Sequence, residues 1–384
     1  MNGVTPGLER FLADPPENAR GGRIGVLTNP SGIDRLLRST VDLLIDHPKL
    51  HVTALFGPEH GVRGEAQAGE HVGGRVDCQT GLPVHSLYGE NRAPTAEMLN
   101  DIDIMVIDLQ DIGVRYATYL STVALAIDAC SVHKKQVIVL DRPNPLGGNR
   151  LAGNIVEPAF ASFVGIHPIP ILHGLTIGEF GKRWARDHQL DQPIVVTMDG
   201  WNREMWFDQT GLPWAPPSPN LPTLDSVTLY PATCLVEGTI LSEGRGTTRP
   251  FEIVGAPWIV PRDLANSLAS IGLDGIGFRP LSFTPIFSKH RGERCGGVQM
   301  YVHNREEFDA VAFGPRLLAT IQGLYPGLFA WLPPTDDDYF IDKLAGSSSL
   351  RTTIDAGGSI DELLDHWRIQ SDDFGASRAD ILLY

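Results

Sequence analysis

Short apolar runs rich in β-branched residues recur through the N-terminal half of the chain, and they constrain its fold more than any other feature. The runs are RIGVL at 23–27, HVTALF at 51–56, DIMVI at 103–107, QVIVL at 136–140 and IVVT at 194–197. Most lack strict apolar–polar alternation, which is typical of strands covered on both faces. Strands that alternate with helices form parallel sheets, so the pattern predicts a doubly wound, mostly parallel α/β domain.

The segments between these runs carry the spacing of amphipathic helices. Leu120, Val123 and Ile127 recur at intervals of three and four residues, which places them on one helical face. Farther along, Thr176 precedes a second helical segment and Glu179 follows it by three residues, the spacing of a capping box. These segments are expected to supply the helices that cover the sheet.

A proline-rich stretch divides the chain. LPWAPPSPNLPT, at 212–223, holds five prolines without helical or strand periodicity, which indicates a rigid extended connection. The chain has 384 residues, and a single hydrophobic core stops growing at roughly 250–300 residues. We therefore expect a first domain over residues 1–222 and a second, smaller α+β domain over residues 223–384.

The second half mixes helical and strand patterns. Apolar residues at 264, 268 and 271 have helical spacing, and residues 299–302 alternate as an antiparallel strand would. A helical segment follows over residues 308–325, with Asn304 expected as its N-cap. Gly314 and Pro315 are expected to break this helix.

Charge and composition narrow the class of ligand. The formal net charge is −15 and the basic residues form no run, which argues against a nucleic acid partner. No stretch approaches the roughly 18 uncharged apolar residues of a membrane span. The N-terminal segment carries Glu9, Asp14 and Glu17 where a secretory signal needs an apolar core. We expect no membrane partner, a cytoplasmic location and a small-molecule ligand.

Signatures of common cofactor and metal sites are missing from the sequence. The four cysteines lie more than fifty residues apart, unlike zinc ligands or a dense disulfide framework. The chain has no P-loop, no G-x-G-x-x-G after a strand, no H-E-x-x-H and no G-x-S-x-G. A metal site formed by His60, Asp108 and Asp111 remains an alternative that no ligand spacing demands. We expect no cofactor.

Polar segments rich in glycine and proline directly follow four of the predicted strands. They are TNPSG at 28–32, GPEHGVRG at 57–64, DLQDIGVRY at 108–116 and DRPNPLGG at 141–148. The loops at the carboxyl ends of parallel strands converge, and ligands bind there. The four segments therefore predict one cleft.

Glu59 is the main candidate for chemistry in this cleft. Its carboxylate lies between Pro58 and Gly61 at a strand end, with Arg63 four residues later. A rigid turn that carries so much charge indicates a side chain directed at a ligand.

Other polar residues in these loops have structural explanations as well. Asp108 and Asp141 could be loop acids that only bind backbone amides. His60, taken alone, is more often a hydrogen-bonded turn residue than a catalyst. The residues themselves leave these alternatives open.

A second dense patch, VEGTILSEGRGTTRPFEIVGAPW, occupies residues 236–258. Its charged residues lie beside apolar ones, which indicates that they face a cleft; they are Glu237, Glu243, Arg245, Arg249 and Glu252. Glycoside hydrolysis uses paired carboxyl groups, one to protonate the leaving oxygen and another as nucleophile or base. Arginines would also bind the carboxylate of an anionic substrate. The sequence thus indicates an enzyme for an acidic small molecule or sugar.

Seven blocks occur in order between Ile24 and the C-terminus: FGPEHGVRG, DLQDIGVRYATY, LDRPNPLGG, HGLTIGE, PSPNLPT, EGTILSEGRGTTRPFEIVGAPW and FIDKLAGSSSLR. Together they resemble the exo-β-N-acetylmuramidase family. The resemblance implies a Rossmann-like domain joined to a smaller C-terminal domain, with the active site between them. It also implies removal of N-acetylmuramic acid, which bears a lactyl carboxylate, from the non-reducing end of peptidoglycan fragments.

The resemblance also implies roles for individual residues. Glu59 becomes the general acid, and the candidates for the partner carboxylate are Asp111, Glu237 and Glu243. The candidates for binding the lactyl carboxylate are Arg63, Arg115, Arg245 and Arg249. The candidates for contacting or orienting the sugar are His60, Asp108, Gln110, Asn144 and His173. A non-catalytic muropeptide-binding protein with the same cleft is the alternative function, and a metal-dependent hydrolase is the third.

Overall fold

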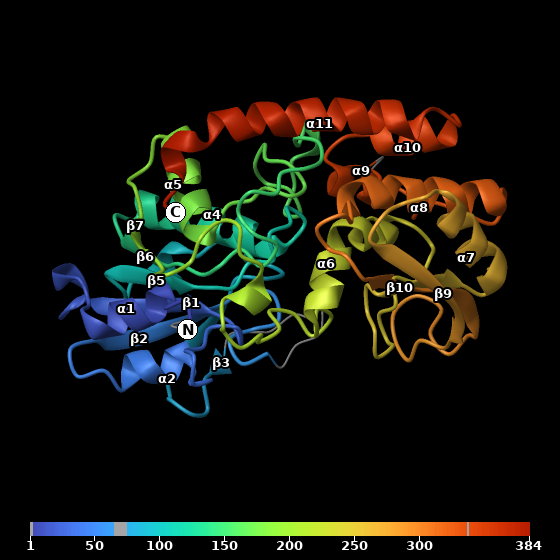
Figure 1. Cartoon of the computed structure of the whole chain (residues 1–384). Coiled ribbons are helices and arrows are strands. Elements are labelled where there is room, and N and C mark those ends of the chain that lie inside the picture. Colours follow the sequence, from blue (N-terminus) through green and yellow to red (C-terminus); the bar gives the residue numbers. More distant parts are fainter. Residues whose placement is uncertain (1–2, 65–74, 336–337) are drawn as a thin grey trace.

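The chain forms a seven-stranded sheet with helices on both faces and a smaller region around a three-stranded sheet (Figure 1). The computed structural model describes residues 3–64, 75–335 and 338–384. The large sheet has the order β3-β4-β2-β1-β5-β6-β7. Its strands are β1 (Arg23–Thr28), β2 (His51–Gly57), β3 (Arg75–Val76), β4 (Pro83–Ser86), β5 (Ile104–Asp108), β6 (Gln136–Leu140) and β7 (Ile194–Val196). All neighbours pair in parallel except β3 and β4.

Successive residues of the central strands enter cores on opposite faces of this sheet. Val26 packs in the core that also contains residues of α1 (Gly7–Ala13) and α2 (Thr40–Ile45). Leu27 packs in the core formed with α4 (Thr118–Val132) and α5 (Ile177–Asp187). A short helix, α3 (Ala96–Leu99), contributes to this second core. Both faces are covered, which confirms the doubly wound α/β fold.

The local signals for α4 and α5 are present in the structure. Leu120, Val123 and Ile127 are buried on one side of α4. The Thr176 side chain accepts a hydrogen bond from the Glu179 amide at 3.2 Å, and the Glu179 carboxylate accepts one from the Thr176 amide at 3.0 Å. This reciprocal pair is the predicted capping box, and it satisfies two amide groups that the first helical turn leaves without partners.

In its described residues, the smaller region contains an antiparallel sheet and six helices. The sheet has the order β8-β10-β9, with β8 (Ile253–Ala256), β9 (Ile276–Phe283) and β10 (Cys295–Val302). The helices are α6 (Leu224–Thr233), α7 (Pro261–Ser270), α8 (Ala310–Leu324), α9 (Phe340–Ala345), α10 (Ser349–Asp355) and α11 (Ile360–Ser377). Short 3₁₀ segments occur in both halves of the chain: η1 (Glu17–Ala19), η2 (Pro158–Phe160) and η3 (Phe207–Gln209) in the first, and η4 (Cys234–Gly238) and η5 (Ala379–Ile381) in the second. The predicted α+β character of this half is confirmed.

The expected break in α8 is wrong. The helix continues through Gly314 and Pro315, and its N-cap is Asp309, whose side chain accepts a hydrogen bond from the Ala312 amide at 2.9 Å. Asn304 accepts instead from the Glu306 amide in the preceding turn, at 3.2 Å. Both Gly314 and Pro315 are buried, so packing against α6 outweighs the hydrogen bond that proline cannot donate.

The two regions are joined at more than the proline-rich connection. Figure 1 shows α11 running from the smaller region back over the large sheet, so that the C-terminus lies near β7 and α5. The Gln370 side chain of α11 accepts a hydrogen bond from the Ile155 amide at 2.7 Å. The junction of the two regions is therefore also held by α11, and a cavity described next lies between the two regions.

Candidate active site

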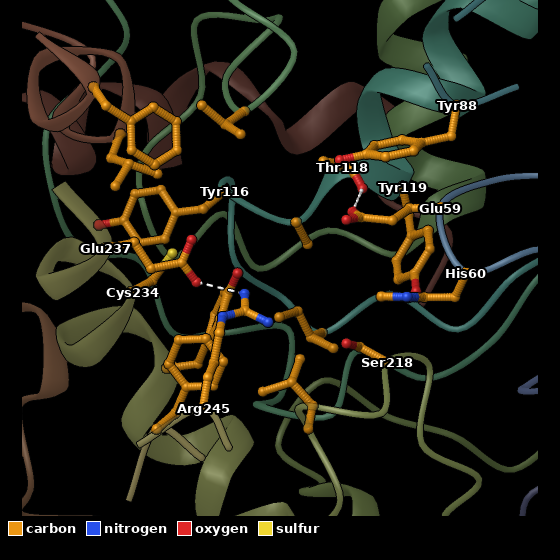
Figure 2. A pocket seen from close by; sticks show the side chains of 18 residues that line it. Glu59, His60, Tyr88, Tyr116, Thr118, Tyr119, Ser218, Cys234, Glu237 and Arg245 are labelled. Carbon is orange, nitrogen blue, oxygen red and sulfur yellow. Dashed lines mark hydrogen bonds and ion pairs between the residues drawn. The ribbon is translucent and has the colours of Figure 1, made fainter. Parts of the chain in front are cut away.

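A cavity of about 150 Å³ lies between the large sheet and the smaller region. One wall consists of loops after β2, β4 and β5 and of the first turn of α4, and its polar residues are Glu59, His60, Tyr88, Tyr116, Thr118 and Tyr119. The facing wall comes from the smaller region and includes Tyr230, Cys234, Glu237, Arg245, Phe251 and Phe340. Figure 2 shows Glu59 and Glu237 on opposite sides of this space. The predicted cleft at the strand ends thus contains residues from both halves of the chain.

The turn that carries Glu59 is held in a tight conformation. The Gly61 amide donates to the Pro58 carbonyl at 3.0 Å, which closes a four-residue turn. His60 has a φ of 75° and Gly61 has a φ of 77°. A left-handed φ is unusual for a residue with a side chain and tends to persist where surrounding contacts enforce it. The turn fixes the backbone from which Glu59 projects into the cavity.

Two hydroxyl groups hold the Glu59 carboxylate. The Thr118 hydroxyl donates to Oε2 of Glu59 at 3.0 Å, and the Tyr88 hydroxyl also forms a hydrogen bond with Glu59. Thr118 is the first residue of α4, so the carboxylate lies at the beginning of a 15-residue helix. Burial, with the Glu59 charge in addition, raises the pKa of Tyr88 to about 12. Tyr88 therefore stays a neutral hydrogen-bond donor near neutral pH.

Glu237 and Arg245 form the charged part of the facing wall. Nη2 of Arg245 lies 2.6 Å from Oε1 of Glu237, and Nε lies 3.3 Å from Oε1 of Glu243. The ammonium of Lys289 lies 2.9 Å from the other Glu243 oxygen. Burial raises the pKa of Glu237, and the charge of Arg245 opposes this shift. Glu237 reaches the cavity, while Glu243 is 1% exposed and lies behind Arg245.

Aromatic rings line the space between the two carboxyl groups. The rings of Tyr116 and Tyr230 are 6.4 Å apart, and those of Tyr230 and Phe251 are 4.7 Å apart in an edge-on arrangement. The guanidinium of Arg245 lies 5.0 Å from the Phe251 ring centre. Aromatic faces bury large apolar areas and can pack against the apolar face of a sugar ring. The cavity thus combines acids with an aromatic surface.

Several predicted site residues lie outside the cavity lining of the described chain and stabilise its loops. Nε2 of His173 lies 3.2 Å from Oδ2 of Asp111, and Nδ1 of His173 accepts from the Leu175 amide at 3.1 Å. Asp111 also accepts from the Gly113 amide at 2.7 Å. This pair holds the loop that follows β5.

Gln110 and Asn144 have similar structural contacts. The Gln110 amide donates to the carbonyls of Asp111 and Pro143, both at 2.7 Å. Asn144 donates to the Leu175 carbonyl at 3.1 Å. These two side chains connect neighbouring strand-end loops instead of lining the described cavity.

Asp108 and Arg115 are buried in contacts with other parts of the chain. Asp108 is fully buried and forms an ion pair with Arg142 at 2.5 Å. Arg115 donates to the carbonyls of Ile169 at 2.9 Å and Ala345 at 3.0 Å, which joins the loop after β5 to α9. Burial lowers the pKa of Arg115 to about 10. The guanidinium of Arg115 therefore joins the two regions.

Arg63 and Arg249 also lie outside the cavity lining. Arg63 pairs with Asp42 at 3.2 Å and with Asp77 at 3.0 Å. Arg249 pairs with Glu252 at 3.2 Å, and its side chain is 46% exposed. Of the arginine candidates, the structure brings Arg245 to the described cavity.

Sequence reasoning missed several residues of the site. Tyr88 follows β4, a four-residue strand that was not predicted, although it too ends in a glycine-containing loop. Thr118 lies within the block DLQDIGVRYATY, but it is uncharged, and the site was predicted mainly from charged residues. Lys289 reaches Glu243 from a loop forty-six residues farther along, and no local pattern signals such a contact.

The described residues contain no group of three or more His, Cys, Asp or Glu side chains arranged to hold a metal ion. His60 lines the cavity whereas Asp108 binds Arg142. Among the described helices, none is both long and apolar enough to cross a membrane.

Comparisons with known proteins agree on one family. Sequence profiles of the N-terminal and C-terminal parts of the exo-beta-N-acetylmuramidase NamZ match residues 24–225 and 228–384. The chain is 47% identical over 382 residues to a peptidoglycan beta-N-acetylmuramidase NamZ from Bacillus subtilis, covering 99% of this chain and 91% of that protein. A DUF1343 family protein from Bacteroides fragilis has a TM-score of 0.90, 36% identity and full coverage of both chains. A second one from the same organism has a TM-score of 0.78, 29% identity and 99% coverage of both.

Proposed function

The chain belongs to the exo-β-N-acetylmuramidase NamZ family, and from this premise we propose that it releases N-acetylmuramic acid from the non-reducing end of peptidoglycan fragments, with Glu59 as the general acid. The chain is a glycoside hydrolase. The observation that carries the proposal is the cavity between the two regions, which Glu59 and Glu237 enter from opposite walls. The relationship to a named enzyme favours catalysis over a non-catalytic sugar-binding protein.

Glu59 suits proton transfer to the leaving oxygen. Its carboxyl group is partly exposed to the cavity, and hydrogen bonds from Thr118 and Tyr88 restrict its orientation. A general acid must lie within hydrogen-bond distance of the atom it protonates, so a fixed rotamer at the cavity wall is an advantage. The rigid turn behind Glu59 serves the same purpose.

Glu237 is the better supported partner among the three candidates. It is the second carboxyl group among the described residues that line the cavity, whereas Asp111 and Glu243 make buried contacts elsewhere. Arg245 at 2.6 Å favours its ionised form, which a nucleophile or base requires. We propose that Glu237 acts on the side of the sugar opposite Glu59.

The lining of the cavity, which has a volume of about 150 Å³, suits a sugar ring. The aromatic surface around Tyr116 and Tyr230 would pack against that ring. A sugar ring of a fragment is therefore the expected occupant.

Hydrolysis of N-acetylmuramic acid glycosides with different leaving groups tests this proposal. Wild-type protein is expected to release the aglycone from a chromogenic glycoside. Glu59→Gln should lower kcat by about 10²–10⁴-fold for a poor leaving group, because general acid catalysis contributes that much. The loss should be much smaller for a leaving group that needs no protonation.

A matched control separates this effect from a general loss of charge. Glu17→Gln makes the same substitution at an exposed residue of η1, away from the cavity, and should leave the rates unchanged. Equal losses for good and poor leaving groups in Glu59→Gln would remove the general-acid assignment. Absence of any hydrolysis by the wild type would remove the proposed reaction itself.

A further inference from the structure

Arg245 has one hydrogen-bond donor that its neighbours do not use. Its Nε points to Glu243 and its Nη2 points to Glu237. Within the described part of the chain, Nη1 is buried and finds no acceptor. An unpaired buried donor costs about 1–3 kcal/mol, and more when the group is charged. The side chain lines the cavity, so an acceptor on a bound ligand could satisfy this donor.

The surrounding charges hold the guanidinium in place and leave room for an anion. Glu243 is fixed by Lys289, whose ammonium also donates to the carbonyls of Val236 at 3.0 Å and Leu241 at 2.8 Å. Two acids, Glu237 and Glu243, face two cations, Arg245 and Lys289. The charges of the two acids and the two cations balance, so the guanidinium is held in place without a net negative charge that would repel an anion. Tyr230 and Cys234, which also adjoin Glu237, are neutral, since burial raises the pKa of both.

We propose that Nη1 of Arg245 binds the carboxylate of an acidic sugar, and that this contact selects N-acetylmuramic acid over N-acetylglucosamine. The inference rests on the proposed function, because it assigns the recognition of the lactyl group that distinguishes the two sugars. A hydrogen bond between a guanidinium and a carboxylate is roughly twice as strong as a neutral one. Its formation satisfies a donor that is already buried, so little further desolvation of Arg245 is needed.

Other cations of the chain are less suited to this role. Arg115 uses its donors on backbone carbonyls that join the two regions. Arg63 and Arg249 pair with acids outside the described cavity lining. Lys289 contacts Glu243 and three backbone carbonyls. Arg245 combines access to the cavity with a donor that lacks an acceptor.

Ligand binding measured by calorimetry tests the selection directly. The ligands are N-acetylmuramic acid, the neutral methyl ester of its lactyl group, and N-acetylglucosamine. Wild-type protein is expected to bind the acid at least about tenfold more tightly than the ester, since hydrogen bonds to charged groups are the stronger class. Arg245→Gln should bring the acid-to-ester ratio close to one. Equal binding of acid and ester by the wild type, or an unchanged ratio in Arg245→Gln, would overturn the inference.

Arg249→Gln provides the matched control. It removes the same charge four residues away, from a side chain that lies outside the described cavity lining, and should keep the wild-type ratio. A loss of selectivity in this variant equal to that in Arg245→Gln would mean that net charge, and not a specific contact, favours the acid.

A second variant guards against misfolding. Arg245→Gln leaves Glu237 without its cation, and an unpaired buried charge can destabilise a protein strongly. The double variant Arg245→Gln/Glu237→Gln removes both charges and should also bind acid and ester equally, with a thermal midpoint that verifies folding. Retained preference for the acid in a folded double variant would contradict the contact.

The two proposals fail in different ways. If the wild type prefers the acid but hydrolyses no N-acetylmuramic acid glycoside, the proposed reaction is lost and the carboxylate contact stands. If it hydrolyses the glycoside but binds acid and ester alike, the reaction stands and the role of Arg245 is lost.

Discussion

Two residues with left-handed backbone conformations face each other across the cavity. His60 has a φ of 75° and Phe251 has a φ of 63°, and both side chains line the space. Such conformations cost roughly 1–3 kcal/mol each and persist where surrounding contacts enforce them. The Phe251 amide donates to the Glu243 carbonyl at 2.7 Å, which helps to hold its strained conformation. Each wall of the cavity thus contains one residue in a backbone conformation that lowers local stability.

Thr118 is predicted to act as a positioning residue for Glu59. Thr118→Val keeps the shape of the side chain but removes the hydroxyl that donates to Oε2 of Glu59 at 3.0 Å. A hydrogen bond to a charged group contributes about 1.5–3 kcal/mol, so kcat should fall by at least about tenfold with little change in KM.

Thr122→Val is the control for this substitution. It removes a hydroxyl one turn later in α4 that donates to the Thr118 carbonyl at 3.1 Å. Its kcat and KM should match those of the wild type. Identical kinetics of Thr118→Val and the wild type would show that Glu59 needs no help from this hydroxyl.

At the scale of single elements, α8 shows how tertiary packing overrides a local rule. Gly314 and Pro315 predicted a break in the helix, yet the helix runs from Ala310 to Leu324 without interruption. A Cβ on Gly314 would lie 2.9 Å from Cδ1 of Leu235 and 3.1 Å from the Ala232 backbone. The glycine therefore permits close contact with α6 and η4. This contact is with residues about eighty positions away in the sequence.

Two glycines of α8 are predicted to respond in opposite ways to alanine. Gly314→Ala should lower the free energy of unfolding by about 1–3 kcal/mol, because the added methyl group overpacks the contact with α6. Gly323→Ala should raise it by about 0.4–1 kcal/mol, since a Cβ there meets no atom within 4 Å and alanine favours the helix. Urea unfolding of both variants measures the two changes. A stabilised Gly314→Ala variant would contradict the packing argument.

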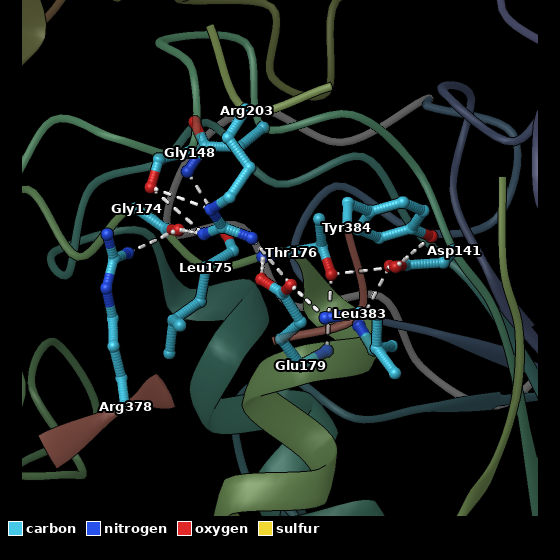
Figure 3. Close-up of polar contacts among 12 residues, drawn as sticks. Asp141, Gly148, Gly174, Leu175, Thr176, Glu179, Arg203, Arg378, Leu383 and Tyr384 are labelled. Atoms are coloured by element: carbon cyan, nitrogen blue, oxygen red, sulfur yellow. Dashed lines mark hydrogen bonds and ion pairs between the residues drawn. The ribbon is translucent and has the colours of Figure 1, made fainter. Parts of the chain in front are cut away.

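At the scale of the whole molecule, the end of the chain closes a polar network beside the large sheet (Figure 3). The Tyr384 hydroxyl donates to Asp141 at 2.8 Å, as does the Thr176 hydroxyl at 2.7 Å. Nearby, the Leu383 amide donates to Glu179 at 2.8 Å, and Arg203 pairs with the same carboxylate at 2.6 Å. The carboxylate of the α5 capping box therefore also holds the C-terminal segment.

Asp141 is predicted to make stability depend on pH. Burial raises the pKa of its carboxyl group to about 7 in the folded protein. In the unfolded chain the pKa of an aspartate is about 3.9. Between these values the folded state binds more protons, so the free energy of unfolding falls as pH rises. The decrease cannot exceed about 1.4 kcal/mol per pH unit for one group.

Asp141→Asn isolates this contribution. The variant lacks the titrating group, while all other ionisable residues remain the same. Urea unfolding between pH 4 and pH 8 should show the wild type losing stability relative to the variant as pH rises to about 7. Parallel pH profiles, or a relative gain by the wild type, would contradict the raised pKa of Asp141.

Much of the fold follows from patterns that lie close together in the sequence. The apolar runs became strands, and Thr176 and Glu179 formed their capping box, because strand burial and helix caps depend on residues a few positions apart. The loops after the strands converged because parallel strands place their carboxyl ends at one edge. Glu59 was predicted as the main candidate for catalysis for a similar local reason, because it is a charged residue in a stiff turn at a strand end.

The tertiary structure decided which charged loop residues reach the cavity and which ones join the chain to itself. Arg115 and Arg245 look alike in the sequence, yet one binds the Ala345 carbonyl, 230 residues away, and the other faces the cavity. A buried cation must find acceptors, and those acceptors come from distant segments that no local pattern reveals. The sequence alone determined five strands of the large sheet, the capping box of α5 and the turn of Glu59. Contacts between distant segments, which form only on folding, placed Glu237 and Arg245 on the facing wall of the cavity.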